Sequence, residues 1–533
     1  MPDVARSFVI MKQGCAGGDR GRAGTVVVVG AGPAGACVVR RLRARLPEPS
    51  GDGLDVHVVD PYPSHAFERA ARATPGPVRV HLHRERAAGL TGGAGRQRVE
   101  LSGGTRLEAD AVVLALGDHG APPSPAEAEQ ALFAARHGLL YVPAGQAADP
   151  DPGLLPAGEP VLVRGAGSAF TRLLALLVSE RGGRFAGGRG GEPVYLPSGD
   201  EPLLYVGSRR GVPHQARPGH RLARPPALPR FVTRDTPPEE LRRAVGKELA
   251  YAYYHELFTA HPERTRVGWD AFEAAFEQAE WGGKEMRALV TRSVPRFADR
   301  LNLDRLDRPL HGMRFGDLAG LQRWMHGYLA AGLERRADPG HSADLALVHG
   351  VLSARAVLAG REPDPWFERL CGFLAGGPPV SRLAELRALA RAGVVTFLGA
   401  GMRVDQDERT ASWRASGATV PGAVGARALV EARLPGPGLS RAVDPLIAAL
   451  RARGECRETT GLLDVRAADR GLVTAAGDAH PRRFALGPWT AVTARPEDHT
   501  ARPEDDAALP GQADAVARAV LARTAASPLG AAA

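Results

Sequence analysis

The chain has 533 residues, 44% of them hydrophobic, which is enough for several domains with buried cores. Its net charge of +9 comes almost wholly from arginines scattered among acidic residues, and no nucleic-acid recognition motif is present, so we predict no nucleic-acid partner. The four cysteines form no CxxC pair and no apolar run reaches the ~18 residues of a membrane span, so we predict no metal site, no membrane partner and a cytoplasmic location.

The N-terminal segment 1–23 is the first feature along the chain. Its apolar run from Phe8 to Met11 is too short for the core of a signal peptide. We expect a disordered tail there and a second tail over 526–533, and Met11 is an alternative start of translation.

A βαβ unit is expected directly after the first tail. Residues 25–29 (TVVVV) form a continuous β-branched run, which is typical of a buried parallel strand. Residues 36–46 predict a helix, and residues 54–59 (LDVHVV) predict a second strand.

The glycine-rich turn inside this unit predicts a dinucleotide site. Gly30 permits a tight turn, Gly32 leaves room for a pyrophosphate, and Gly35 lets the helix approach the strand. The helix N-terminus offers free N–H groups to phosphate oxygens, and Asp60 is expected to bind the hydroxyls of an adenosine ribose. A glycine-rich turn in an unrelated α/β protein is the alternative. The residues that we predict to bind FAD here are Gly30, Gly32, Pro33, Ala34, Gly35 and Asp60.

Further strands and a linker are predicted before the pattern repeats. Residues 78–83 alternate like an exposed strand, and residues 97–107 indicate a hairpin. Residues 111–116 predict a buried strand that ends at Gly117. The Pro- and Gly-rich stretch 149–159 predicts a linker.

A second unit of the same kind begins at about residue 160. Residues 160–164 (PVLVR) predict a strand that leads into a new glycine-rich turn, and a helix and another strand follow. That strand is followed by Arg209 and Arg210 instead of an acid. Arginine suits the 2′-phosphate of a ribose, so NADPH is favoured over NADH, and a solvated arginine turn is the alternative. The predicted NADPH-binding residues are Gly165, Gly167, Ser168, Ser208, Arg209 and Arg210.

The rest of the chain is predicted to be first helical and then mixed. Tyrosines on one helix of the region 237–376, among them Tyr251 and Tyr254, are expected in the core and not as ligands. The charged tandem repeat at 494–506 predicts a disordered loop. Beyond the helical region we predict strands at 394–398, 427–434 and 484–486 and a last helix at 514–525.

Stretches along most of the chain resemble a known family. TVVVVGAGPAGACVVRRL, EPVLVRGAGSAFTRLLALL, GKELAYAYYHELFTAHPERT and HPRRFALGPWT are similar to actinobacterial FAD/NAD(P)-binding proteins related to flavin-dependent N-hydroxylating monooxygenases. The resemblance implies a discontinuous FAD domain with an inserted NADPH domain and helical region. It also implies that Gly117 lies at a strand end near the flavin, that Gly487 lies near the returning FAD segment, and that reduced flavin and molecular oxygen hydroxylate an amine.

Two departures from this family concern the reactive half of the flavin. The segment between Asp60 and residue 78 is shorter than in relatives, where it covers the flavin ring. Gln512 and Asp514 also stand where relatives have an Asn-Asp pair. These departures motivate an alternative in which the chain binds dinucleotides without turning over.

We therefore predict an α/β fold with two Rossmann-like dinucleotide-binding domains and a helical insert. The function is predicted to be that of an FAD-dependent, NADPH-consuming monooxygenase that N-hydroxylates a small amine or amino acid. The alternatives are a catalytically impaired scaffold or sensor, and a flavin reductase or oxidase that releases peroxide. We assign no catalytic residue and leave homo-oligomerisation open. The expected layout is an FAD domain at 24–157, an NADPH domain at 158–236, the helical insert at 237–376, the NADPH return at 377–424 and the FAD return at 425–525.

Overall fold

The computed structural model describes two compact units. Unit 1 draws its residues from 1–116, 449–456 and 465–533, and unit 2 from 117–448 and 457–464. Each unit is considered by itself. The described residues are 24–46, 53–61, 63, 67, 77–115, 124–144, 152–188, 191–217, 222, 225–227, 229–358, 361–362, 364–433, 444–459, 461–487, 489–492 and 509–525.

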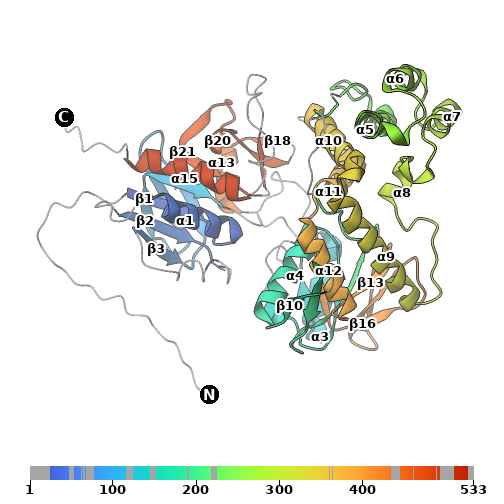
Figure 1. Ribbon diagram of the computed structural model, residues 1–533. Coiled ribbons are helices and arrows are strands. Elements are labelled where there is room, and N and C mark those ends of the chain that lie inside the picture. Colours follow the sequence, from blue (N-terminus) through green and yellow to red (C-terminus); the bar gives the residue numbers. More distant parts are fainter. Residues whose placement is uncertain are drawn as a thin grey trace, which may run out of the picture. The chain divides into compact units, whose positions relative to one another are not determined.

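Unit 1 is built on a parallel sheet (Figure 1). Its strands run in the order β21-β7-β1-β2-β3, each parallel to the next. The apolar strand β1 lies in the middle because its valines are buried, as a strand covered on both faces requires. The bounds are β1 (Gly24–Val29), β2 (Leu54–Val59), β3 (Val78–His83), β7 (Ala111–Leu114) and β21 (Ala479–Ala485).

Two helices cover this sheet. α1 (Pro33–Arg45) packs against α15 (Leu509–Ala525), and Figure 1 shows the two side by side on the strands. Val38 and Leu42 of α1 share one core with Val516 and Val520 of α15. The predicted βαβ unit at the start of the chain is therefore confirmed.

A small antiparallel sheet connects β3 to β7 in unit 1. It consists of β4 (Ala87–Thr91), β5 (Gln97–Leu101) and β6 (Arg106–Ala109), so the predicted hairpin is confirmed. The fully buried Arg483 of β21 donates to Gln97 Oε1 over 2.7 Å and to Glu455 Oε2 over 2.7 Å. This charged link fixes the small sheet against the parallel one.

Unit 2 repeats the plan of unit 1. Its five-stranded sheet has the order β13-β12-β9-β17-β8, and all neighbours are parallel. In both units the strand before the glycine-rich turn is central, and a three-stranded antiparallel sheet precedes the strand on its other side. The parallel strand at the far end differs in origin. In unit 1 it is β21, which follows β7 along the chain, and in unit 2 it is β8, which precedes β9. The bounds are β8 (Leu140–Val142), β9 (Pro160–Arg164), β12 (Leu203–Ser208), β13 (Val395–Ala400), β14 (Arg403–Asp407), β15 (Ser412–Ser416), β16 (Val424–Ala426) and β17 (Ala428–Val430).

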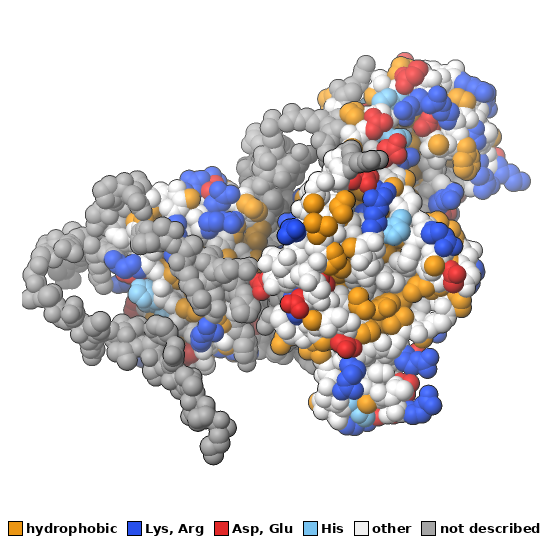
Figure 2. All heavy atoms as spheres, turned by 60° about the horizontal axis from the view of Figure 1, so that its bottom comes forward, with side chains coloured by type: hydrophobic (Ala, Val, Ile, Leu, Met, Phe, Trp, Pro, Cys, Tyr) orange, Lys and Arg blue, Asp and Glu red, His pale blue; other side chains and the backbone are white. Residues whose placement is uncertain are grey.

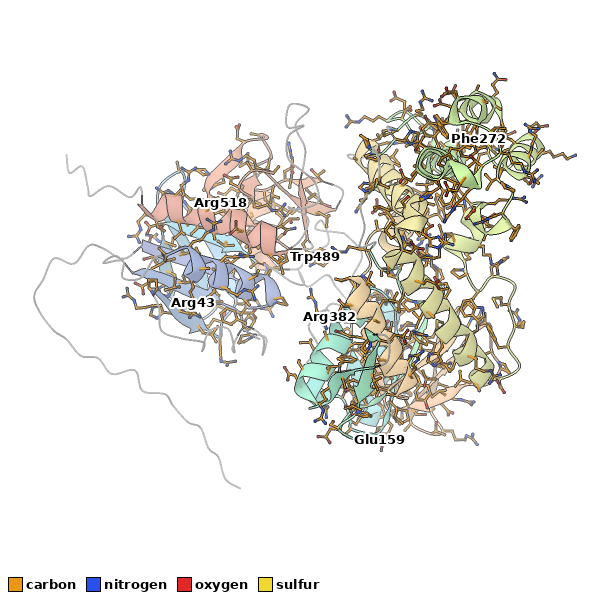
Figure 3. All side chains as sticks on the ribbon, viewed as in Figure 1. Arg43, Glu159, Phe272, Arg382, Trp489 and Arg518 are labelled. Carbon is orange, nitrogen blue, oxygen red and sulfur yellow. The ribbon has the colours of Figure 1, made fainter. Side chains whose placement is uncertain are left out.

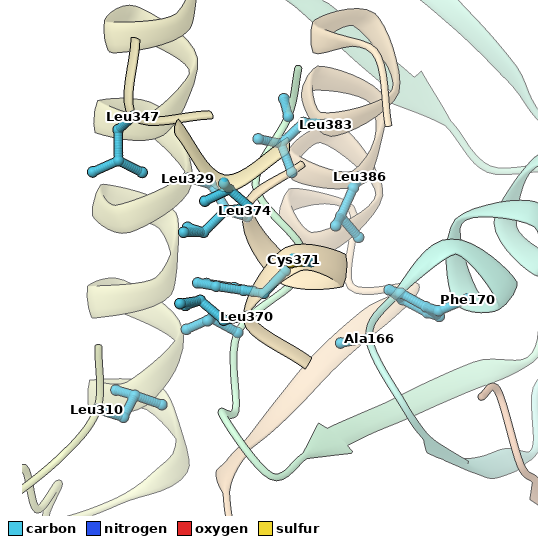
Figure 4. Close-up of a cluster of buried hydrophobic side chains, with 14 of the residues drawn as sticks. Ala166, Phe170, Leu310, Leu329, Leu347, Leu370, Cys371, Leu374, Leu383 and Leu386 are labelled. Carbon is cyan, nitrogen blue, oxygen red and sulfur yellow. The ribbon is translucent and has the colours of Figure 1, made fainter. Parts of the chain in front are cut away.

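A helical region lies within unit 2 between β12 and β13. Tyr254 and Phe272 are buried there, with ring centroids 5.4 Å apart, so the prediction that the tyrosine helix is core is confirmed (Figure 3). Figure 4 shows how Leu370 and Leu386 of this region share a core with Phe170 beside the parallel sheet. The helices are α5 (Pro238–Ala260), α6 (Trp269–Gln278), α7 (Lys284–Ser293), α8 (Leu303–Asp307), α9 (Leu318–Ala337), α10 (Ser342–Val357), α11 (Pro365–Leu374) and α12 (Val380–Arg391).

The remaining described elements complete the two units. Charged side chains of both signs are interspersed on the face seen in Figure 2, which is the pattern that the sequence indicates. Among the described helices, none has the length and apolar character needed to cross a membrane. The further bounds are α3 (Pro125–His137), α4 (Ser168–Glu180), β10 (Arg184–Gly187), β11 (Pro193–Leu196), α13 (Pro445–Ala452), β18 (Glu458–Thr459), β19 (Leu462–Val465), β20 (Gly471–Val473) and β22 (Thr490–Val492).

Two segments lie in the other unit from the one that the sequence indicates. We expected residues 425–434 to return to the first domain, but β17 pairs with β9 in the sheet of unit 2. We also expected 124–144 in the first domain, but β8 pairs with β17. An apolar run predicts a buried strand without stating which of two similar sheets it joins. Both tails, the 494–506 repeat and Gly117 lie outside the described residues.

Candidate dinucleotide-binding sites

The first glycine-rich turn forms a tight corner between β1 and α1. Gly30 has a φ of 113°, which favours glycine, and its N–H donates to the Val59 oxygen over 2.9 Å. A Cβ on Gly35 would lie 2.1 Å from the Gly30 oxygen, so only glycine allows this helix to approach the turn. Pro33 and Ala34 are the first two residues of α1.

The corner leaves an open cradle at the start of α1. Among the residues that the structure describes, a Cβ on Gly32 would meet no atom within 4 Å, and no side chain caps the helix. Some helices have a cap whose side chain accepts from the backbone, as α3 has in Ser124 and α9 in Asp317, whereas others, such as α5 and α7, have none. The N–H groups at the start of α1 are thus left for an anion, and this arrangement fits a dinucleotide pyrophosphate.

Asp60 lies at the end of β2, beside the glycine turn. Its carboxylate Oδ2 accepts a hydrogen bond from the Ala31 N–H over 2.7 Å, and its own N–H donates to the His83 oxygen over 3.0 Å. The sequence predicts that this acid binds a ribose, but it does not predict the hydrogen bond between Asp60 and the Ala31 N–H. The carboxylate is therefore held in position by the backbone that forms the cradle.

Gly487 follows β21 at the same edge of the sheet. Leu486 N–H donates to the Leu114 oxygen over 3.1 Å, so the ends of β21 and β7 meet there, and β1 pairs with β7. Gly487 has a φ of 115°, and its N–H donates to Gln512 Oε1 over 3.1 Å. Cofactors bind at the carboxyl ends of parallel strands in such folds, which is where Gly487 and Asp60 both lie.

The second glycine-rich turn forms a like corner between β9 and α4. Gly165 has a φ of 132°, and a Cβ on it would lie 2.1 Å from the Ala432 oxygen. Gly167 precedes α4, which begins at Ser168 and has no side-chain cap. The prediction that each glycine triplet lies at a strand-to-helix corner is confirmed.

The space above Gly167 differs from the space above Gly32. A Cβ on Gly167 would lie 2.9 Å from Cε1 of the His214 ring. The backbone N–H of His214 donates to the Ala166 oxygen over 3.1 Å. Burial of His214 lowers the pKa of its ring to about 4, so it is neutral near pH 7. The sequence does not indicate this histidine, because it lies far along the chain from the turn.

The arginine pair after β12 divides into two environments. Arg210 pairs with Asp307, donating to its backbone oxygen over 2.8 Å, and its guanidinium lies 4.6 Å from the Phe373 ring centroid. The Arg209 backbone oxygen accepts from the Gly401 N–H over 3.2 Å, whereas its exposed side chain has no hydrogen-bond or ion-pair partner within the part of the chain that the structure describes. Desolvation of part of the side chain, followed by the neighbouring cation of Arg369, lowers the pKa of Arg209. The Ser208 hydroxyl oxygen accepts from the Gly211 N–H over 2.9 Å and shapes the turn.

Comparison with known proteins identifies the family. Residues 62–119 match the family described as FAD-NAD(P)-binding. Over 477 residues the chain is 35% identical to an L-aspartate N-monooxygenase (nitrosuccinate-forming) of Streptomyces davaonensis, with 79% of this chain and 72% of the relative covered. The chain belongs to this family of N-monooxygenases. A second N-monooxygenase of the same printed activity, from Streptomyces cremeus, is 34% identical over 544 residues, with 88% and 78% covered.

Membership of the N-monooxygenase family settles the class of the protein. The chain is a flavin-dependent oxidoreductase that uses FAD and a nicotinamide dinucleotide and oxygenates nitrogen. A solved steroid monooxygenase bound to NADP aligns with 95% of this chain and 84% of its own, at 14% identity and a TM-score of 0.33. The parallel sheets of the two units confirm the predicted α/β fold with two Rossmann-like domains, and membership of the family confirms the predicted monooxygenase class.

Proposed function

We propose that this N-monooxygenase hydroxylates the amino nitrogen of L-aspartate or of a closely similar amino dicarboxylate. The observation that carries the proposal is the match, over most of both chains, to N-monooxygenases whose printed substrate is L-aspartate, together with the two intact glycine corners. These relatives favour a working enzyme over the scaffold that the short segment after Asp60 suggested.

The two glycine corners are proposed to divide the cofactors between them. In unit 1 the open N-terminus of α1 would hold the FAD pyrophosphate and Asp60 its ribose. In unit 2 the N-terminus of α4 would hold the pyrophosphate of NADPH, and Arg209 its 2′-phosphate. Arg210 is already engaged by Asp307, so we propose that it braces the turn instead of binding phosphate.

The reaction balances as amine, molecular oxygen, NADPH and one proton giving hydroxylamine, NADP⁺ and water. FAD, when bound, supplies the means by which a hydride from NADPH is used to activate oxygen. The residues of this chain bind and orient the two dinucleotides. Further oxidation of the hydroxylamine would consume further oxygen and NADPH.

Oxygen uptake and product analysis test the proposal. L-aspartate should accelerate NADPH oxidation by the FAD-loaded protein and should yield N-hydroxyaspartate or its oxidation products by mass spectrometry. If no amine changes the rate of NADPH oxidation and all the oxygen consumed appears as hydrogen peroxide, the protein is a reductase or oxidase instead. A protein that stays colourless after FAD is added would restore the scaffold alternative.

The cellular setting follows as part of the proposal. NADPH and free aspartate are cytoplasmic metabolites, and the three described cysteines, Cys37, Cys371 and Cys456, are free thiols. We therefore propose that the enzyme works in the cytoplasm. Fractionation of a producing cell, followed by detection of the protein with an antibody, tests this location.

A further inference from the structure

The helical region of unit 2 contains a cavity that the dinucleotide sites do not explain. Its volume is about 280 Å³, which is close to the lower end of the roughly 300–1,000 Å³ of small-molecule pockets and suits a small metabolite. Helices α5, α9, α10 and α12 line it together with residues 213–216 and 298–306. The charged and polar residues in its wall include His214, Gln215, Arg300, Arg335, Arg336 and Asp344.

Arg336 brings a buried positive charge to this cavity without an acidic partner. The residue is 5% exposed, and its Nη2 donates to the neutral side-chain oxygen of Gln215. Its Nη1 is buried and has no hydrogen-bond partner among the described residues. Burying a charge in this way is costly unless an anion compensates it.

Asp344, an acid in the wall of the same cavity, is already engaged. Asp344 accepts from Arg335 through two hydrogen bonds, of 2.8 and 2.9 Å. Arg300 donates to the backbone oxygens of Val294 over 2.8 Å and Pro295 over 3.0 Å, which are neutral groups. Arg305 also lines the cavity and is exposed. The wall therefore carries an excess of positive charge.

His214 relates this cavity to the second glycine corner. Its ring lines the cavity and also contacts the position above Gly167. Its Nδ1 is buried without a partner among the described residues, and the ring is neutral near pH 7. The wall thus offers a fixed cation at Arg336 and a neutral hydrogen-bonding group at His214, both within unit 2.

We propose that this cavity binds a small amino dicarboxylate, with one carboxylate on Nη1 of Arg336. The choice of an amino dicarboxylate rests on the proposed function, whereas the need for an anion rests on Arg336 alone. A carboxylate suits the site because a guanidinium donates to it through charge-assisted hydrogen bonds. The site would place the substrate in the unit that we assign to NADPH.

Isothermal titration calorimetry of the FAD-loaded full chain with L-aspartate tests this inference. Arg336→Met should weaken binding at least tenfold without lowering the Tm, because it removes a buried charge that has no acidic partner. Arg323→Met, at an exposed arginine of the same helix, is the matched control and should leave binding unchanged.

A second variant keeps the test decisive if Arg336→Met does not fold. A Cβ on Gly332 would meet no atom within 4 Å, and Gly332 lines the cavity, so Gly332→Leu should fill the cavity and leave the helix intact. Gly327→Leu on the same helix is its control, because Gly327 is exposed and equally unhindered. Only Gly332→Leu should weaken L-aspartate binding.

Three results would overturn the inference. They are equal L-aspartate affinity in the wild type and both cavity variants, no L-aspartate binding by the wild type, and tighter binding of inorganic phosphate than of L-aspartate. Failure of the proposed function is distinguishable from these. L-aspartate that binds through Arg336 but is never hydroxylated would contradict the function, whereas hydroxylation with an unchanged KM in both variants would contradict the cavity.

Discussion

The carboxylate of Asp60 accepts a hydrogen bond from the backbone N–H of Ala31 over 2.7 Å. This bond joins the end of β2 to the turn that follows β1, so the acid proposed to bind the ribose also holds the phosphate cradle. A substitution at Asp60 can therefore change both the stability of the turn and the affinity for FAD, and different replacements should affect these two properties to different extents.

Asp60→Asn should keep the bond to Ala31, because an amide oxygen also accepts, but it removes the negative charge. We expect an unchanged Tm of the FAD-free protein and about tenfold weaker FAD binding, as befits a lost charge-assisted hydrogen bond. Asp60→Ala should lower both the Tm and FAD affinity. Differential scanning fluorimetry and flavin fluorescence titration measure the two. A Tm that falls equally in both variants would contradict the prediction that Asp60→Asn weakens FAD binding without destabilising the turn.

The glycines at the same corner provide a second matched pair. Gly35→Ala places a Cβ 2.1 Å from the Gly30 oxygen, so the helix must move, and we expect a loss of about 2 kcal/mol or more of unfolding free energy. Gly32→Ala meets no atom within 4 Å, so the FAD-free protein should remain stable while FAD binding weakens. Urea unfolding and the visible absorption spectrum of the purified variants check these outcomes. Unaltered FAD affinity in Gly32→Ala would show that the pyrophosphate lies elsewhere.

Arg209 and Arg210 are adjacent, yet their replacement should have different effects. Arg209→Ala should raise the KM for NADPH about tenfold or more and leave that for NADH unchanged, because a 2′-phosphate distinguishes the two cofactors. Steady-state kinetics with both cofactors measure this. An equal change in the two KM values would contradict the proposed role of Arg209.

Arg210→Ala should act on stability instead. Asp307 is 5% exposed and would lose its close ion pair with Arg210, keeping the bond from Trp366 Nε1 of 3.1 Å and a longer ion pair of 3.9 Å with Arg308. Removing one partner of a buried pair costs about 3 kcal/mol, so we expect a clear fall in the urea midpoint and little change in the ratio of NADPH to NADH KM values. A changed ratio with an unchanged midpoint would show that Arg210, too, binds phosphate.

Sequence reasoning succeeded where local pattern decides structure. The valine run of β1 and the alternation of β3 mark strands by their neighbours alone, and the glycine spacing marks the corner at Gly30. It failed where partners are distant in sequence. β17 was assigned to the wrong sheet, since two parallel sheets of the same order accept the same apolar strand.

The candidate sites show the same limit at the level of side chains. The partner of Arg210 is Asp307, 97 positions away, so the sequence could not distinguish it from Arg209. Arg336 meets Gln215 across 121 positions, and its lack of an acidic partner is visible only once Asp344 is seen with Arg335. In so arginine-rich a chain, composition gives no sign of which guanidinium is buried.

The buried ring of His214 predicts a dependence of stability on pH. Burial, followed by the cation of Arg210, lowers the pKa of His214 from 6.5 to about 4 in the folded chain. Between these values the unfolded chain binds a proton that the folded chain does not, so stability falls as the pH drops from about 6.5 towards 4 and is fully present above that range. The full difference amounts to about 3 kcal/mol, from ~1.4 kcal/mol per pKa unit.

His214→Asn removes this group, so its Tm should fall less steeply between pH 7 and pH 5 than that of the wild type, whatever its starting value. The exposed His311→Asn should keep the wild-type slope. Parallel slopes for the wild type and His214→Asn would mean that the His214 ring titrates alike in the folded and unfolded chains.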